Sequence, residues 1–119
     1  MHKWSVWEAV IAPQMMLENL IAIVDYNKLQ SDMTPSCDII NFGNLAAKFE
    51  SFGWDVYDVD GHDIVQLVGA FEAKQATGKP KMIVANTIKG KGIPFMENNN
   101  EWHHGRITQK IYDDAIKFI

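Results

Sequence analysis

The sequence contains a single cysteine, no long apolar run and no excess of positive charge, and each shortage disfavours a class of protein. Cys37 alone cannot form an internal disulfide or a cysteine-based zinc site, which favours a reducing, cytoplasmic compartment. The longest plain apolar run, Leu20–Val24, is far shorter than the roughly 20 residues that a membrane-spanning helix needs. A net charge of −4 disfavours nucleic acid as the main partner.

The rest of the composition is that of an ordinary folded chain. Of the 119 residues, 47% are hydrophobic and 22% are charged, which does not resemble a disordered protein. Because typical domains contain about 100–200 residues, we expect residues 1–119 to form a single domain.

Helical and strand patterns alternate along the chain. The apolar spacing predicts helices over residues 4–18, 44–52, 64–75 and 107–119, and strands over residues 20–25, 54–59 and 81–86. The first and last of these strands consist largely of aliphatic residues and are expected to be buried on both faces. This alternation predicts an α/β fold, a three-layer parallel sheet with helices on both faces.

Two of the predicted helices carry apolar stripes, and their aromatic and methionine side chains are expected to lie in a core or an interface. Gly53 is expected to end the helix before it, Asp63 to cap the helix after it, and Pro13 to kink or interrupt the first helix. The stripe of the first helix consists of Trp4, Trp7, Ile11 and Met15. The stripe of the helix after Asp63 consists of Ile64, Leu67, Val68 and Phe71.

Polar loops follow all three predicted strands. Right-handed crossovers place the carboxyl ends of parallel strands at one edge of the sheet, where ligands of such folds bind. The loops begin at Asp25, Asp60 and Thr87, so functional residues are expected there. The loop at residues 60–63 is explained by a tight turn and a helix cap, although His62 can titrate near neutral pH.

The first loop offers oxygen ligands for a divalent cation. The side-chain oxygen of Asn27 and the backbone carbonyl of Leu29 lie two residues apart and can reach the same ion. Magnesium prefers such hard oxygen ligands and often takes phosphate oxygens as well. Alternatively, the asparagine closes a local turn on its own backbone, and the residues alone leave both interpretations open.

The third loop alternates lysine with glycine and then becomes rich in asparagine and histidine. Lys89 and Lys91 can neutralise an anion while the glycines let the backbone approach it, although a solvated basic loop has the same composition. The segment matches neither the Walker nor the dinucleotide-binding pattern. Adjacent histidines cannot easily share one metal ion, which disfavours a zinc site. His103 or His104 can instead donate a hydrogen bond to a phosphate or shuttle a proton. Alternatively, both belong to a surface loop.

Six segments, in order, resemble the thiamine-diphosphate-binding domain of transketolases, and especially the N-terminal section of the split, two-gene enzymes. They keep the family's order and approximate spacing over nearly the whole chain. The segments read WEA (residues 7–9), ENLIAIVDYNKLQ (18–30), FGWDV continuing to VDGHD (52–63), PKMIVANT (80–87), KGKG (89–92) and FMENN continuing to WH (95–103).

The resemblance implies a thiamine-diphosphate fold, with the diphosphate and Mg²⁺ (or Ca²⁺) at the carboxyl edge of the sheet. By matching position, Asn27 would bind the metal through its side chain and Leu29 through its carbonyl. The implied activity is the transfer of a two-carbon ketol unit between sugar phosphates, with the thiamine ring performing the covalent chemistry.

The resemblance also assigns roles to the basic residues. Lys89 and Lys91 fall in the segment near the diphosphate. The family's histidine that contacts cofactor and substrate falls on His103 or His104, and His103 is favoured because it directly follows Trp102.

The sequence departs from the family in one major respect. The family places a Gly-Asp-Gly motif, whose aspartate is the charged metal ligand, upstream of the Trp-Glu-Ala helix, and this chain has no such motif. The domain that binds the aminopyrimidine ring has no counterpart either. We therefore expect the chain to be the C-terminal portion of the domain, working in a homo- or hetero-oligomer with a chain that carries both missing parts.

Three functions remain open at this point. The first is an enzyme component that is inactive without its partner chains. The second is a non-catalytic remnant or assembly module of the same fold, suggested by the missing aspartate and by Pro13. The third is an unrelated phosphate-binding α/β protein that uses the lysine–glycine loop.

Overall fold

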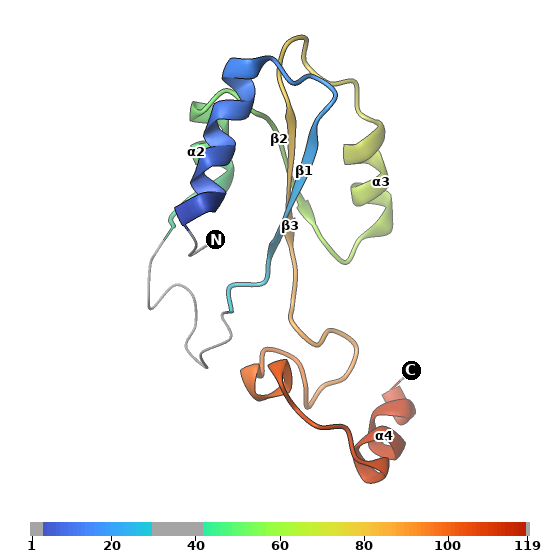
Figure 1. The fold of residues 1–119 in the computed structure, drawn as a ribbon. Coiled ribbons are helices and arrows are strands. Elements are labelled where there is room, and N and C mark those ends of the chain that lie inside the picture. Colours follow the sequence, from blue (N-terminus) through green and yellow to red (C-terminus); the bar gives the residue numbers. More distant parts are fainter. Residues whose placement is uncertain (1–3, 30–41, 119) are drawn as a thin grey trace. The chain divides into compact units, whose positions relative to one another are not determined.

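The computed structural model describes residues 4–29 and 42–118 and shows the predicted alternation of helices and strands (Figure 1). Residues 30–41, which follow β1 and include Cys37, lie outside the described residues. In chain order the elements, with η denoting a 3₁₀ helix, are η1 (Trp4–Met15), β1 (Ile21–Tyr26), α2 (Leu45–Ser51), β2 (Asp55–Asp60), α3 (Ile64–Glu72), β3 (Lys81–Asn86), η2 (Asn100–His103), α4 (Gln109–Ala115) and η3 (Ile116–Phe118).

The three strands form a parallel sheet in the order β1-β3-β2, which confirms the predicted α/β architecture. Tyr26 of β1 and Asp60 of β2 both pair in register with Asn86 of β3. All three strands therefore end at the same edge. The loops that follow the neighbouring strands β1 and β3 begin at this edge, with Asn27 and Thr87.

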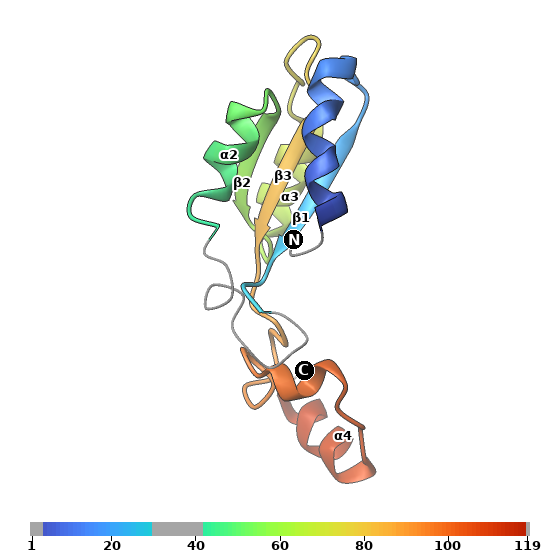
Figure 2. The same cartoon turned by 60° about the vertical axis from the view of Figure 1, so that its left-hand side comes forward.

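Helices cover both faces of the sheet. Figures 1 and 2 show η1, in dark blue, and α2 on one face, and α3 on the other. On the first face, the rings of Phe49 and Trp54 meet edge to face with their centres 6.0 Å apart, within a buried cluster that includes Met82 and Val84 of β3. This cluster holds η1 and α2 against the sheet.

A glycine ends α2 as predicted and also allows η1 to pack closely. Gly53 follows the helix with a φ of +96°, a conformation that residues with a side chain rarely adopt. A Cβ atom at this position would lie 3.2 Å from the Cβ atom of Pro13. The glycine therefore serves both the backbone turn and the contact between η1 and the end of α2.

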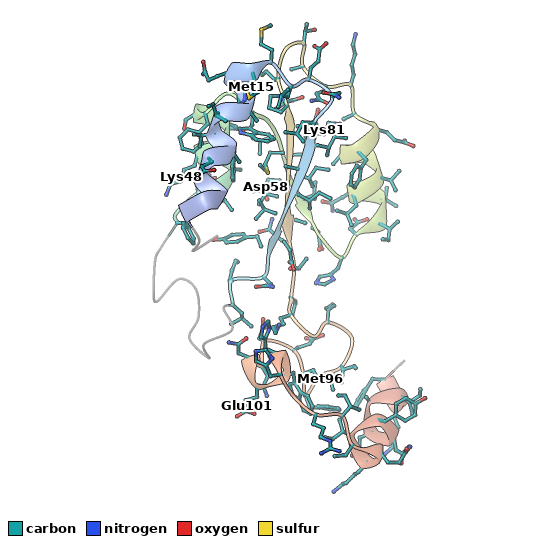
Figure 3. The ribbon with its side chains drawn as sticks, viewed as in Figure 1. Met15, Lys48, Asp58, Lys81, Met96 and Glu101 are labelled. Atoms are coloured by element: carbon teal, nitrogen blue, oxygen red, sulfur yellow. The ribbon has the colours of Figure 1, made fainter. Side chains whose placement is uncertain are left out.

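The central strand β3 is buried along almost its whole length, as predicted, and it contains a buried lysine. Lys81 is 1% exposed. Its Nζ atom donates hydrogen bonds to the carbonyls of Ala70 (2.7 Å), Phe71 (3.0 Å) and Ala73 (2.7 Å) at the C-terminal end of α3. A cation at a helix C-terminus is favourable, so Lys81, labelled in Figure 3, fixes α3 to the sheet.

The prediction that the first strand is buried on both faces is wrong. Burial along β1 alternates, and Ile21 and Ile23 are 39% and 54% exposed. The reason is the strand order: β1 lies at the edge of the three-stranded sheet, whereas α3 packs on β2 and is tied to β3 through Lys81.

The predicted stripe of the first helix is wrong at two of its four positions. Ile11 and Met15 are 57% and 60% exposed, whereas Ala9 and Ala12 face the buried cluster. The helix has 3₁₀ hydrogen bonding with three residues per turn, so positions three apart align, and it continues through Pro13 to Met15. The side chains of the other two stripe residues lie outside the described part of the chain: Trp4 and Trp7.

The predicted stripe of α3 faces the sheet only in part. Leu67 is half-buried, and Ala70, which was not in the stripe, is buried. Ile64, Val68 and Phe71 are 70%, 47% and 44% exposed. The helix also ends at Glu72, three residues before its predicted end.

The chain divides into two compact units. One consists of Met1–Tyr26 with Phe42–Asn86 and contains the sheet, and the other consists of Asn27–Asn41 with Thr87–Ile119. In the second unit, the ring of Phe95 lies 5.6 Å from that of Trp102 and 6.3 Å from that of Phe118, between centres. None of the helices in residues 4–29 and 42–118 combines the length and apolar character that crossing a membrane requires.

Candidate functional site

The residues singled out from the sequence all belong to the second compact unit: Asn27, Leu29, Lys89, Lys91, His103 and His104. The first two lie in the segment that follows β1, and the other four lie in the segment that follows the adjacent strand β3. The geometry within this unit shows which of these residues interact with one another.

In the first loop, Asn27 closes a local turn. Its Oδ1 atom accepts a hydrogen bond of 3.0 Å from the backbone N–H of Leu29, and Lys28 between them has a φ of +61°. The turn interpretation of this asparagine is therefore correct in this structure. An amide oxygen has two lone pairs, so this hydrogen bond by itself does not prevent the oxygen from binding a metal.

The lysine–glycine loop folds back on itself through backbone hydrogen bonds. Gly90 and Gly92 have φ values of +75° and +98°, a conformation that residues with a side chain rarely adopt. The carbonyl of Lys89 accepts a hydrogen bond of 2.9 Å from the N–H of Asn98, which closes the loop. A Cβ atom on Gly90 would overlap the carbonyl of Met96, whereas Gly92 faces open space.

An acidic residue that the sequence analysis did not single out holds the tip of this loop. Glu97 Oε1 accepts a hydrogen bond of 3.1 Å from the N–H of Gly92 and lies 3.8 Å from Lys91 Nζ. Glu97 thus partly neutralises Lys91, which makes Lys91 less available to an anion than Lys89. In the sequence, this contact is indicated only by an acidic residue six positions after a lysine in a glycine-rich loop.

Two of the predicted residues meet in space. Lys89 Nζ lies 3.1 Å from His103 Nδ1, although the residues are 14 positions apart. A lysine ammonium group can only donate, so Nδ1 must accept, and the proton of the neutral imidazole is then on Nε2. The pair therefore offers one ammonium group, at Nδ1, and one N–H donor, at Nε2 on the other side of the imidazole ring.

The second histidine lies against the first. The rings of His103 and His104 are 4.5 Å apart between centres and meet edge to face. His103 is the last residue of η2, and the neighbouring Trp102 donates a hydrogen bond of 3.2 Å from Nε1 to the carbonyl of Phe95. This tryptophan links η2 to the end of the lysine–glycine loop, which helps bring His103 to Lys89.

The loop after β2, in the first unit, forms a tight turn and the N-terminal cap of α3. Asp60 Oδ1 accepts a hydrogen bond of 2.9 Å from the N–H of His62, which forms the tight turn. Asp63 Oδ1 accepts from the N–H groups of Val65 (2.9 Å) and Gln66 (3.2 Å), which confirms it as the cap of α3. Its hydrogen bonds with Gln66 are the main reason that the pKa of the Asp63 carboxyl is lowered.

The described residues suit an anion better than they suit a bare metal ion. Within residues 4–29 and 42–118, no three His, Cys, Asp or Glu side chains come together as a metal site. The metal ligands predicted from the first loop, Asn27 and Leu29, are both neutral, and Mg²⁺ usually also binds carboxylates and phosphate oxygens. The donor set therefore fits a phosphate group directly and a metal ion only if further oxygens complete it.

Comparisons of the chain with family models, with known sequences and with solved structures all indicate the same family. The family described as "Transketolase, thiamine diphosphate binding domain" matches residues 4–116. The chain is 42% identical to the 6-deoxy-6-sulfo-D-fructose transketolase subunit SqwG of a Clostridium species, over 94% of this chain and 41% of that protein. It is 34% identical to one of the subunits of the apulose-4-phosphate transketolase of Phocaeicola vulgatus, over 97% of this chain and 41% of that protein.

The fold is similar to that of solved transketolases. The structure of transketolase from Campylobacter jejuni aligns with a TM-score of 0.83 at 25% identity, over 97% of this chain and 18% of that one. The chain thus spans about two-fifths of the length of the subunits that it matches, and a smaller share of that transketolase.

Proposed function

The chain belongs to the transketolase family through its thiamine-diphosphate-binding domain, and on this premise we propose that it forms part of the cofactor site of a ketol-transferring enzyme. The observation that carries the proposal is the contact between Lys89 and His103 in the loop region after β3. The loop that bears Asn27 leaves the neighbouring strand at the same edge of the sheet. We propose that residues 1–119 act as the C-terminal portion of this domain.

Lys89 and His103 would hold the diphosphate. Lys89 supplies a positive charge, and His103 supplies an N–H group on Nε2 for a phosphate or substrate oxygen. Lys91 adds a weaker contribution because Glu97 partly neutralises it. His104 is the alternative donor. When bound, thiamine diphosphate supplies the carbon–carbon bond chemistry by which a two-carbon ketol unit passes between sugar phosphates.

Asn27 and Leu29 would bind Mg²⁺ (or Ca²⁺) beside the diphosphate, through the side-chain oxygen and the backbone carbonyl. Both ligands are neutral, so the proposal requires a carboxylate from elsewhere. We propose that a chain carrying a Gly-Asp-Gly segment and the aminopyrimidine-binding domain supplies it, in a homo- or hetero-oligomer. The lone Cys37 is consistent with the proposed cytoplasmic location.

A non-catalytic assembly module is the second candidate function. Two observations favour it: the Asn27 side chain is already used in a turn, and Glu97 lies beside Lys91. Such a chain would keep the transketolase fold without binding the cofactor in any assembly.

Calorimetric titration with thiamine diphosphate and Mg²⁺ separates the two functions. We expect weak or no binding by the chain alone, and binding when a chain bearing Gly-Asp-Gly is added. In that mixture, Lys89→Met should weaken binding about tenfold or more, because a charge-assisted contact to phosphate is lost. Lys110→Met, which removes an exposed lysine on α4, serves as the matched control and should leave binding unchanged.

Two outcomes would contradict the enzyme proposal. One is the absence of cofactor binding in every mixture, which would support the assembly module. The other is equal binding by the Lys89→Met and Lys110→Met variants, which would show that the lysine–glycine loop does not contact the diphosphate. Ketol transfer by the purified chain alone would contradict the proposed dependence on a partner.

A further inference from the structure

Two consecutive residues close the lysine–glycine loop at two levels. At the base of the loop, the N–H of Asn98 donates a hydrogen bond of 2.9 Å to the carbonyl of Lys89. At the tip, Glu97 Oε1 accepts a hydrogen bond of 3.1 Å from the N–H of Gly92 and lies 3.8 Å from Lys91 Nζ. The start and the far end of the loop are therefore held from the same short piece of chain.

The closure at the base fixes the backbone from which the Lys89 side chain extends. Asn98 has a φ of +53°, which turns the chain sharply at this point. Residues other than glycine rarely adopt this left-handed conformation, although asparagine tolerates it better than most. Such a residue persists only where its surroundings hold it. The side chain of Glu97, one residue earlier, makes a contact that holds this turn.

The same turn leads directly to His103. Asn99 Oδ1 accepts a hydrogen bond of 3.0 Å from the N–H of Glu101, which caps η2, and His103 is the last residue of that helix. A short capped turn leaves the chain little freedom, so the place of the His103 ring depends on how the chain leaves Glu97. Glu97 thus lies at the junction between the loop that carries Lys89 and the helix that carries His103.

We propose that Glu97 is a positioning residue, which brings Lys89 into contact with His103 by holding the Gly92 end of the loop. The contact itself joins Lys89 Nζ to His103 Nδ1 over 3.1 Å. An ionised carboxylate only accepts hydrogen bonds, so Glu97 has no donor for an anion and acts through the loop instead. This inference deepens the proposed function and rests on it for the role of the pair at the diphosphate.

The negative charge of Glu97 allows a positioning role to be separated from a purely electrostatic one. By charge alone, a carboxylate beside Lys91 repels an anion, so its removal would strengthen the binding of a phosphate group. By position, its removal frees the loop and separates Lys89 from His103, so binding would weaken. The hydrogen bond from Gly92 needs an oxygen acceptor but no charge, so a glutamine can keep the position without the charge.

Two substitutions and a control test the proposal on the full chain. Glu97→Ala removes the acceptor and the charge, whereas Glu97→Gln removes the charge and keeps an acceptor. Glu101→Gln, the control, removes the charge of an exposed acid in η2 that is labelled in Figure 3. In ¹⁵N spectra recorded without any ligand, we expect Glu97→Ala to move the His103 imidazole signals toward those of a Lys89→Met variant. The other two variants should keep the wild-type signals.

Cofactor binding supplies a second, separate measurement. Calorimetric titration with thiamine diphosphate and Mg²⁺ uses the mixture with a chain bearing Gly-Asp-Gly. We expect Glu97→Ala to weaken binding about three- to tenfold, which corresponds to the loss of one hydrogen bond that orders the site. Glu97→Gln should bind at least as tightly as the wild-type chain, and Glu101→Gln should change binding less than about twofold. Circular dichroism should show that all three variants remain folded, because neither glutamate belongs to the buried core.

Three results would overturn the inference. The first is that Glu97→Ala leaves the His103 signals of the wild-type chain unchanged, and the second is that it binds the cofactor more tightly, as charge alone requires. The third is that Glu97→Gln moves the His103 signals as far as Glu97→Ala does, which would assign the effect to the charge beside Lys91 instead of the hydrogen bond from Gly92. Moved His103 signals in Glu97→Ala, with no cofactor binding in any mixture, would support this inference and contradict the proposed function.

Discussion

Replacing Lys81 by methionine tests the contact that fixes α3 on the sheet. The substitution keeps an unbranched apolar stem and removes the ammonium group, which donates to the carbonyls of Ala70, Phe71 and Ala73. The hydrogen bond to Ala70 is fully buried, whereas those to Phe71 and Ala73 are only partly buried. Water can therefore replace the ammonium group at two of the three carbonyls.

The magnitude follows from this difference in burial. One buried carbonyl left without a donor costs about 1–3 kcal/mol. Loss of a cation at the helix C-terminus adds about 1 kcal/mol. The ammonium group also lies 5.0 Å from the centre of the Tyr57 ring, a contact that methionine would keep only through its stem. We expect Lys81→Met to lower the free energy of unfolding by about 2–4 kcal/mol.

Urea unfolding followed by circular dichroism measures this loss. With a slope of about 2 kcal/mol per molar urea, the midpoint should fall by roughly 1–2 M. Lys79→Met, two residues away at an exposed lysine, should change the free energy by less than about 0.5 kcal/mol. If the two variants unfold at the same urea concentration, the Lys81 ammonium group does not fix α3 to the sheet.

Three further predictions concern the loops. In ¹⁵N spectra, the His103 imidazole should have its proton on Nε2, and Lys89→Met should mix the two tautomers; an unchanged spectrum would refute the contact. Gly90→Ala should lower the free energy of unfolding by about 3 kcal/mol, because the backbone strain adds to the overlap with Met96. Gly92→Ala, which has the strain alone, should lower it by only about 1 kcal/mol. Equal losses of the two variants in thermal unfolding would contradict this. The pKa of the Asp63 carboxyl is lowered in the folded chain. The ionised carboxyl therefore stabilises the folded chain fully above the pKa that it has in the unfolded chain, and this contribution is lost as the pH falls through the pKa that it has in the folded chain. Asp63→Asn should keep the cap but show a smaller loss of stability on acidification in urea titrations at several pH values; an unchanged pH dependence would refute this role.

Local patterns were reliable wherever the nearest neighbours in the chain decide the structure. The order of helices and strands, the Asp63 cap and the glycine after α2 all follow from a few adjacent residues. The aliphatic run of β3 predicted burial correctly because a central strand is covered on both faces. The similar run of β1 misled, because a strand at the edge of the sheet can carry the same residues with one face exposed.

The sequence supplied candidate site residues, which remain predictions, but it did not supply the contacts among them. Matching segments identified Asn27, Lys89 and His103, but nothing in the sequence shows that Lys89 contacts His103 rather than solvent. The partial neutralisation of Lys91 by Glu97 was missed for the same reason. Each of these contacts depends on how a loop folds back, which its composition does not specify.

From its sequence alone, this chain can be placed in an α/β class and related to a family, because hydrophobic periodicity and short motifs are properties of neighbouring residues. Strand order, the side of α3 that meets the sheet, the burial of Lys81 and the contact between Lys89 and His103 came only from the folded chain. These features depend on groups far apart in the sequence, whose packing and desolvation energies exist only once the chain has brought them together.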